Sequence, residues 1–184
     1  SGESRWQYYG RTPSGTRYAP FTQINRDNVQ QLEVAWTFRT GMVAGPGSED
    51  QNTPTQIGDT VYVCTPRNQV FALDADTGEQ KWKFDPQADT KAWNRCRGVG
   101  YYEPAAVTRR VGGIPAPAPV EGRACAQRIV LTTVDARLIQ IDAKTGQPCQ
   151  GFGQGGTVDL KQGMGKIKAL YYFEPSMPSV VRNL

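Results

Sequence analysis

The sequence contains no histidine among its 184 residues. This absence excludes histidine-based catalytic triads and histidine-rich zinc sites within the chain. The four cysteines, at positions 64, 96, 125 and 149, form no C-x-x-C pair, so we expect neither a zinc knuckle nor a thioredoxin-type redox motif. No apolar run approaches the roughly 20 residues that a membrane-spanning helix requires, and no signal peptide is recognised at the start.

A strong charge of one sign is also missing. The formal net charge is +4, and the basic residues are scattered, with only small groups such as Arg109 and Arg110 close together. Nucleic-acid binding is therefore not expected. The hydrophobic fraction of 38% and the charged fraction of 21% are typical of a globular domain with a full core.

The chain repeats itself at an offset of 68 residues. Residues 61–78 (VYVCTPRNQVFALDADTG) align without gaps to residues 129–146 (IVLTTVDARLIQIDAKTG). Each copy contains two β-rich runs followed by a tight turn, where aspartate side chains bond to backbone N–H groups and Gly78 supplies a positive φ. A repeated unit of strands and turns is typical of a β-propeller or a β-solenoid.

The pattern predicts an all-β fold made of about two propeller blades and an outer strand of a neighbouring blade. The Trp-x-Phe pattern at Trp36 recurs at Trp82, which suggests an outer strand at both places, whereas the offset puts Gln150 where the second blade should carry its tryptophan. We expect a glycine-rich mobile loop at 151–168. The expected boundaries are an N-terminal segment at 1–45, a first blade at 50–85, a second at 96–150 and the start of a third at 169–184.

The length is short for a closed ring. At roughly 40–45 residues per blade, six to eight blades need a longer chain. We therefore interpret the sequence as part of a longer protein, whose open blade edges are covered by the remaining chain or by self-association.

The even number of cysteines permits disulfides in an oxidising compartment. Cys96 and Cys125 bracket a loop insertion in the second unit, so we expect a bridge between them. Cys64 lies in a strand-like run and is expected to be a small buried hydrophobe.

Residues 72–82 (ALDADTGEQKW) resemble the tryptophan-docking motif of quinoprotein dehydrogenases, A-x-D-x-x-x-G-x-x-x-W. The segments YGRTPSGTRYAP at 9–20, QINRDNV at 23–29, AWTFRTG at 35–41 and CRGVGY at 96–101 resemble the same proteins. Their order and spacing are most similar to the N-terminal part of the membrane-bound glucose, quinate and shikimate dehydrogenases that use pyrroloquinoline quinone (PQQ).

This resemblance implies an eight-bladed propeller in the periplasm, anchored in the inner membrane by another segment, with PQQ and calcium or magnesium on its axis. The substrate would be a polyol or a cyclic polyhydroxy acid such as quinate or shikimate, with glucose as a further option. An aspartate base would assist net hydride transfer to PQQ, and ubiquinone would accept the electrons. In the family this aspartate and the metal ligands lie beyond Leu184, so we expect residues 1–184 alone to be inactive.

The resemblance also assigns roles to four residues at the cofactor. Arg97 matches an arginine that approaches PQQ, and a guanidinium binds carboxylate oxygens as a bidentate fork. Gln51 stands where many relatives carry a glutamate that faces the cofactor, and an amide can both donate and accept there. Thr132 and Ser176 match further hydroxyl contacts. The alternatives are a loop-bracing arginine, a polar loop residue and ordinary strand residues.

Two departures from the family pattern concern the pocket. Alcohol-oxidising relatives stack PQQ on a disulfide between adjacent cysteines, and here only Cys96 is present, which favours the membrane-bound branch. Tyr102 stands where glucose-oxidising members typically carry histidine. It would either hydrogen-bond a substrate hydroxyl or pack at the interface between blades.

The alternative function is a non-catalytic propeller scaffold, similar to outer-membrane assembly lipoproteins built from the same repeats. The segment that begins at Cys96 and the loop at Gln51 distinguish the two functions, because a scaffold has no need of an arginine aimed at the propeller axis.

Overall fold

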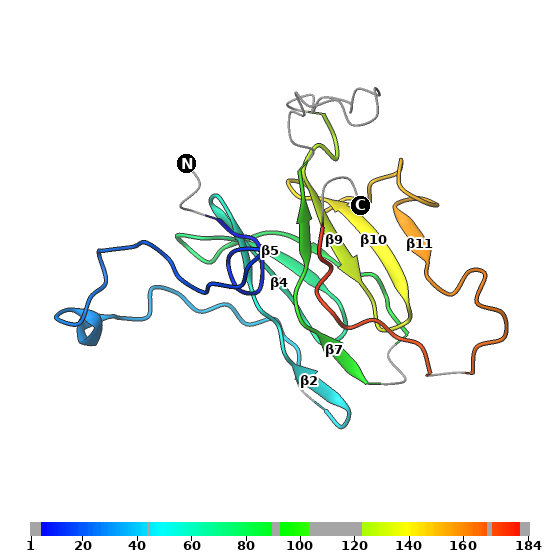
Figure 1. Cartoon of the computed structure of the whole chain (residues 1–184), viewed down its shortest axis with the longest axis horizontal. Coiled ribbons are helices and arrows are strands. Elements are labelled where there is room, and N and C mark those ends of the chain that lie inside the picture. The colour runs from blue at the N-terminus through cyan, green and yellow to red at the C-terminus, as the bar shows by residue number, and fades with distance from the viewer. Residues whose placement is uncertain (1–4, 44, 90–92, 104–122, 169–170, 181–184) are drawn as a thin grey trace.

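The computed structural model describes residues 5–43, 45–89, 93–103, 123–168 and 171–180. These residues form two antiparallel sheets, one parallel pair of strands and a single-turn 3₁₀ helix, η2 (Val29–Gln31), which lies on an arm that extends away from the sheets (Figure 1). Within these ranges no helix has the length and apolar character needed to span a bilayer. The expected all-β class is confirmed.

The first sheet has the order β1-β3-β4-β5-β6. Strands β3 to β6 follow one another along the chain as an antiparallel meander. Strand β1 pairs with the free edge of β3 and thereby ties the N-terminal part of the chain to this sheet. The strands are β1 (Arg5–Trp6), β3 (Thr55–Ile57), β4 (Thr60–Cys64), β5 (Val70–Asp74) and β6 (Gln80–Phe84).

The second sheet has the order β8-β9-β10-β11 and is built from β8 (Gly100–Tyr102), β9 (Arg128–Thr132), β10 (Arg137–Asp142) and β11 (Thr157–Asp159). Its outer strand β11 lies beyond residue 150, within the stretch 151–168 for which the sequence predicts a mobile loop, so three residues of that stretch form a strand and extend the second sheet. Gly153, Gly155 and Gly156 all have positive φ. They reverse the chain so that the β-branched Thr157 pairs with Ile139 of β10.

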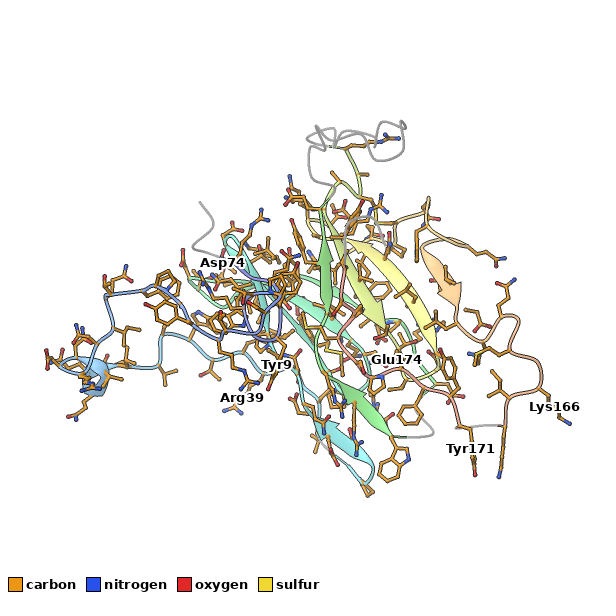
Figure 2. All side chains as sticks on the ribbon, viewed as in Figure 1. Tyr9, Arg39, Asp74, Lys166, Tyr171 and Glu174 are labelled. Carbon is orange, nitrogen blue, oxygen red and sulfur yellow. A yellow bond between two sulfur atoms is a disulfide. The ribbon has the colours of Figure 1, made fainter. Side chains whose placement is uncertain are left out.

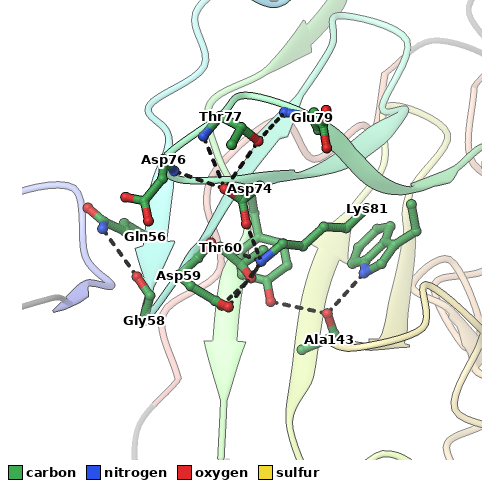
Figure 3. A network of polar contacts seen from close by, with 12 residues as sticks. Gln56, Gly58, Asp59, Thr60, Asp74, Asp76, Thr77, Glu79, Lys81 and Ala143 are labelled. Carbon is green, nitrogen blue, oxygen red and sulfur yellow. Dashed lines mark hydrogen bonds and ion pairs between the residues drawn. The ribbon is translucent and has the colours of Figure 1, made fainter. Parts of the chain in front are cut away.

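The repeat appears in the turns as well as in the strands. Asp74 Oδ1 accepts hydrogen bonds from the backbone N–H groups two and three residues ahead and from the Thr77 hydroxyl (Figure 3). Asp142 Oδ1 accepts the same three bonds, the last of them from Thr145. Burial by itself raises the pKa of Asp142, but the N–H groups directed at it hold that pKa below its ordinary value. The Asp142 side chain therefore remains a carboxylate that accepts hydrogen bonds from the N–H groups of the turn.

The two sheets are joined by the Trp82 side chain of β6. Its Nε1 donates a hydrogen bond to the carbonyl oxygen of Ala143 over 3.0 Å, and its ring lies on Gly146. A Cβ atom at Gly146 would lie 2.8 Å from the Trp82 ring, and the φ of this glycine is +73°. Only glycine satisfies both conditions without strain.

Trp36 makes the same contact one unit earlier. Its Nε1 donates to the carbonyl oxygen of Ala75 over 3.0 Å, and its ring lies on Gly78. However, residues 34–38 belong to no strand ladder in the described chain, so the outer strand of a neighbouring blade expected there stays a prediction. A β-rich run becomes a strand only beside a partner, and the described chain offers none. The segment instead contacts the first sheet through Trp36 and through the Phe38 ring, 5.2 Å from the Phe71 ring.

The hydrophobic core lies between the two sheets. Strand β4 alternates buried and half-buried residues, so one face of the strand points into this core. Burying apolar surface stabilises the interface by about 25 cal/mol per Å². The cluster consists of Tyr62, Cys64, Val70, Ala72, Trp82, Cys96, Val99, Tyr101, Ile129, Leu131, Ile139, Ile141 and Ala143.

A short parallel ladder joins the segments that lead into the two sheets. Strand β2 (Ser48–Asp50) precedes the first sheet's β3, and β7 (Asn94–Cys96) precedes the second sheet's β8 (Figure 1). Asp50 pairs with Cys96 in this ladder. Residues 51 and 97, which follow, therefore leave the ladder side by side.

The disulfides differ from the expected pairing. Cys64 bonds to Cys96 and Cys125 bonds to Cys149, with Cα–Cα distances of 6.0 and 5.8 Å, so the predicted Cys96–Cys125 bridge is wrong. Cys96 precedes β8 and Cys125 precedes β9, and these strands run antiparallel. The two cysteines therefore lie at opposite ends of the second sheet, too far apart for a disulfide.

We predict that Gly146→Ala destabilises the protein more than Gly58→Ala. Both glycines have positive φ, but a Cβ at Gly58 meets nothing within 4 Å. Gly58→Ala therefore lowers the free energy of unfolding only by the cost of placing alanine in the left-handed region, about 1 kcal/mol. The overlap with Trp82 adds roughly 1–3 kcal/mol at Gly146. Thermal unfolding of the full-length variants measures the difference. Equal losses would show that the tryptophan does not constrain the turn.

Candidate functional site

The candidate site begins where the β2 and β7 ladder ends. Arg97 Nε donates a hydrogen bond to Gln51 Oε1 over 3.0 Å, and Gln51 Nε2 donates to Glu49 Oε2 over 2.6 Å. The Gln51 amide thus uses both its acceptor and its donor. This chain of bonds holds the Arg97 side chain beside Gln51, and both side chains are exposed.

The backbone of Arg97 is held on both sides. Its N–H donates to the Pro175 carbonyl oxygen, and its own carbonyl oxygen accepts from the Thr53 N–H, each over 3.1 Å. The following residue, Gly98, has a φ of +144°, and a Cβ there would lie 3.1 Å from Met177 Sδ and 3.2 Å from the Thr53 oxygen. Glycine is therefore required where the three segments meet.

Thr132 and Ser176 join the same place. Thr132 Oγ1 donates to the Ser176 carbonyl oxygen over 2.7 Å, next to the residue whose carbonyl holds Arg97. The structure thus brings together all four residues predicted to contact the cofactor, which we call the rim cluster (Gln51, Arg97, Thr132 and Ser176). Thr132 is buried, whereas the other three are exposed. The Thr132 hydroxyl positions Ser176 and is itself already engaged.

Tyr102 does not belong to the rim cluster. It pairs with Arg128 in the β8 and β9 ladder, and the Arg128 guanidinium carbon lies 5.6 Å from its ring centroid. Thr132 is four residues further along β9, which corresponds to about 13 Å in a strand. The proposed substrate contact by Tyr102 stays a prediction.

Arg97 differs from Arg95 and Arg137 in the partners of its guanidinium group. Arg95 forms an ion pair with Glu49 over 3.0 Å, and Arg137 forms one with Asp135 over 2.8 Å. Among the described residues, no carboxylate forms an ion pair with Arg97. An exposed guanidinium with a fixed backbone and no anionic partner is suited to bind a carboxylate ligand. The same residues contain no group of three or more cysteines or carboxylates arranged to hold a metal ion.

The sequence interpretation missed the connection beneath the rim cluster. The Cys64 N–H donates to Asn52 Oδ1 over 3.1 Å, and Cys64 is bonded to Cys96. A signal for this position existed in the repeat, because the offset of 68 aligns Cys64 with Thr132 as the last residues of equivalent strands. Cys64 therefore had to lie at the same end as Thr132.

A concavity of about 530 Å³ lies between the sheets at the ends opposite the rim cluster. In it Lys81 Nζ forms ion pairs with Asp59 and Asp74, both at 3.2 Å (Figure 3). Burial lowers the pKa of Lys81, but the two carboxylates outweigh burial and keep that pKa above its ordinary value. The lysine is thus already neutralised by the protein. The rim cluster, with its unpaired arginine, is the better candidate for an anionic ligand.

Comparison with known proteins covers nearly the whole chain. The family model described as PQQ glucose/ethanol/alcohol dehydrogenase, beta-propeller domain, matches residues 6–184. The chain is 42% identical over 182 residues to quinate/shikimate dehydrogenase (quinone) from Acinetobacter baylyi, covering 95% of this chain and 22% of that protein. It is 39% identical over 185 residues to quinoprotein glucose dehydrogenase from Escherichia coli, covering 97% and 22%. The chain thus spans about a fifth of the length of these relatives.

Solved structures show the same fold. A quinohemoprotein alcohol dehydrogenase from Comamonas testosteroni matches with a TM-score of 0.64 at 24% identity, over 89% of this chain and 20% of that one. One from Pseudomonas putida HK5 matches with a TM-score of 0.62 at 28% identity, over 87% and 19%. The expected assignment to part of a larger β-propeller is confirmed.

We predict that Thr132→Val loosens the segment at 174–177 while leaving the sheets intact. Valine keeps the shape of threonine but cannot donate to the Ser176 oxygen, which costs about 1 kcal/mol. Hydrogen exchange should become faster in residues 171–180. Thr132→Ser retains the hydroxyl and serves as the control. Unchanged exchange in Thr132→Val would show that this bond does not hold the segment.

Proposed function

The chain belongs to the family of PQQ-dependent glucose, ethanol and alcohol dehydrogenase β-propeller domains, and from this we propose that it is part of an enzyme that uses PQQ to oxidise a polyhydroxylated alcohol. The observation that carries the proposal is the exposed, unpaired Arg97 at the rim cluster. Relatives named for quinate, shikimate and glucose support a substrate with several hydroxyl groups, as a polyol or a cyclic polyhydroxy acid.

The residues of the rim cluster fit a carboxylated quinone. PQQ carries three carboxylates, and the Arg97 guanidinium would bind one of them through charge-assisted hydrogen bonds. Gln51 would hold that guanidinium in place and present its amide to the same ligand, while Thr132 would hold the backbone at Ser176. When bound, PQQ supplies the two-electron acceptor for alcohol oxidation. The protein's part is to orient this acceptor.

Other parts of the enzyme would complete the reaction. We propose that a divalent ion, calcium or magnesium, and the aspartate base are held by residues outside this chain, and that electrons pass to ubiquinone. We place the enzyme in the periplasm, bound to the inner membrane. The two disulfides support this location, because disulfides form and persist in oxidising compartments.

Arg97→Ala in the full-length protein tests the cofactor assignment. Loss of a charge-assisted hydrogen bond costs about 1.5–3 kcal/mol, so PQQ should bind roughly 10- to 100-fold more weakly. Arg97→Lys keeps the charge without the fork and should give an intermediate value. Titration of PQQ in the presence of calcium, followed by fluorescence, measures the affinity.

The control for this titration is Lys166→Ala, which removes the same charge at the outer loop that follows β11 (Figure 2). Its PQQ affinity should equal that of the unmodified protein. If Arg97→Ala also binds PQQ with unchanged affinity, Arg97 is not a cofactor ligand. If the unmodified protein binds no PQQ, the scaffold function replaces the dehydrogenase.

The substrate class is tested with a panel of alcohols. We predict PQQ-dependent dye reduction with quinate, shikimate or another polyol by the full-length protein, and a kcat/KM at least about tenfold lower with ethanol, because hydroxyl-binding groups left unpaired cost more than 1.4 kcal/mol. Residues 1–184 alone should give no dye reduction. A preference for ethanol would contradict the polyhydroxylated substrate.

A further inference from the structure

The rim cluster is closed by a covalent link. Gln51 is adjacent to Asn52, whose Oδ1 accepts the backbone N–H of Cys64. Cys64 is bonded to Cys96, and Cys96 is adjacent to Arg97. Arg97 returns to Gln51 through its Nε hydrogen bond of 3.0 Å. Gln51 and Arg97 are thus joined by two routes, one their own hydrogen bond and the other the Asn52–Cys64 hydrogen bond followed by the disulfide.

The disulfide cannot act as a contact surface for a ligand. Cys64 is 3% exposed and Cys96 is 2% exposed, and both belong to the core between the sheets. Asn52 Oδ1 lies 3.2 Å from the Cys64 sulfur and covers it on one side. Any effect of this disulfide on a bound molecule must pass through the residues attached to it.

Apart from this link, the segments that carry Gln51 and Arg97 are joined by a short ladder, by the Arg95–Glu49 ion pair and by the single backbone bonds of Arg97 to Thr53 and Pro175. Strands β2 and β7 pair over three residues each, and no further strand of the described chain pairs with either of them. A two-stranded ladder of this length is marginal by itself. Gln51 and Arg97 lie just beyond its end, where a single backbone hydrogen bond, from Thr53 to Arg97, joins the two segments. The disulfide connects β7 to the end of β4, which is anchored in the first sheet by pairing with β3 and β5.

We propose that the Cys64–Cys96 disulfide is a positioning element for the anion-binding pair Arg97 and Gln51. By fixing β7, which leads into the second sheet, to β4 of the first sheet, it sets the spacing between Arg97 and Gln51. The disulfide thereby prearranges the guanidinium for a carboxylate of the cofactor. This inference rests on the proposed PQQ-binding function and assigns to the disulfide a role beyond stability.

The second disulfide provides a matched control. Cys125–Cys149 closes a similar length of chain, with a sequence separation of 24 against 32 for Cys64–Cys96, so its effect on the unfolded state is nearly the same. It lies at the opposite ends of the strands, beside the turn capped by Asp142. Its removal should lower stability without reaching the rim cluster.

The test compares PQQ affinity in full-length Cys64→Ala/Cys96→Ala with that in Cys125→Ala/Cys149→Ala. We expect about tenfold weaker binding in the first variant, the scale found when groups that support a ligand are removed, and no more than a twofold change in the second. Hydrogen exchange at 48–53 and 93–97 should become faster only in the first. Cys64→Val/Cys96→Ala refills part of the lost volume and should behave like the first variant, which keeps the test decisive if the alanine pair folds poorly.

A double-mutant cycle identifies the route of the effect. If the disulfide acts through the arginine, removing it in the Arg97→Ala background should weaken PQQ binding by less than twofold. Equal PQQ affinity in the two disulfide variants, or full additivity with Arg97→Ala, would overturn the proposal. A wrong assignment of the PQQ-binding function itself gives a different result: the unmodified protein then binds no PQQ, or Arg97→Ala leaves its PQQ affinity unchanged.

Discussion

The placement of one indole ring on one glycine determines how the two sheets meet. Trp82 lies on Gly146 and donates to the Ala143 oxygen, so the outer strand of the first sheet is fixed against the turn of the second. The core between the sheets then follows from the alternation of buried residues along the strands. At the far ends of those strands, the same geometry brings β2 beside β7 and Gln51 beside Arg97.

The strands could be predicted from the sequence wherever the repeat was visible. The offset of 68 located β4 and β5 of the first sheet and β9 and β10 of the second, because alternation and turn chemistry are local properties. Features set by distant parts of the chain were not accessible. Residues 34–38 have β-rich composition but no partner strand in the described chain, and β11 is a strand because it pairs with β10. The cysteine partners depended on which strand ends meet.

The family resemblance predicted which residues form the rim cluster, but it did not predict how they are arranged. The sequence motifs assigned Arg97, Gln51, Thr132 and Ser176 to one ligand, yet nothing in their spacing shows that the backbone at 175–176 joins Arg97 to Thr132. That connection links segments that are more than 40 residues apart, and such contacts follow from tertiary structure alone. Tyr102 shows the converse, since it is near Arg97 in sequence and lies toward the other end of its strand.

The tryptophan contacts also have a direction. Trp36 packs on a turn of the first sheet, and Trp82 packs on a turn of the second. The equivalent position in the second unit is Gln150, and β11 carries no tryptophan. Within the described chain, each sheet is held by the segment before it. Because each tryptophan precedes the turn on which it packs, both contacts run from an earlier segment of the chain to a later sheet. The row of sheets therefore has a polarity along the chain, which the positions of the two indoles set.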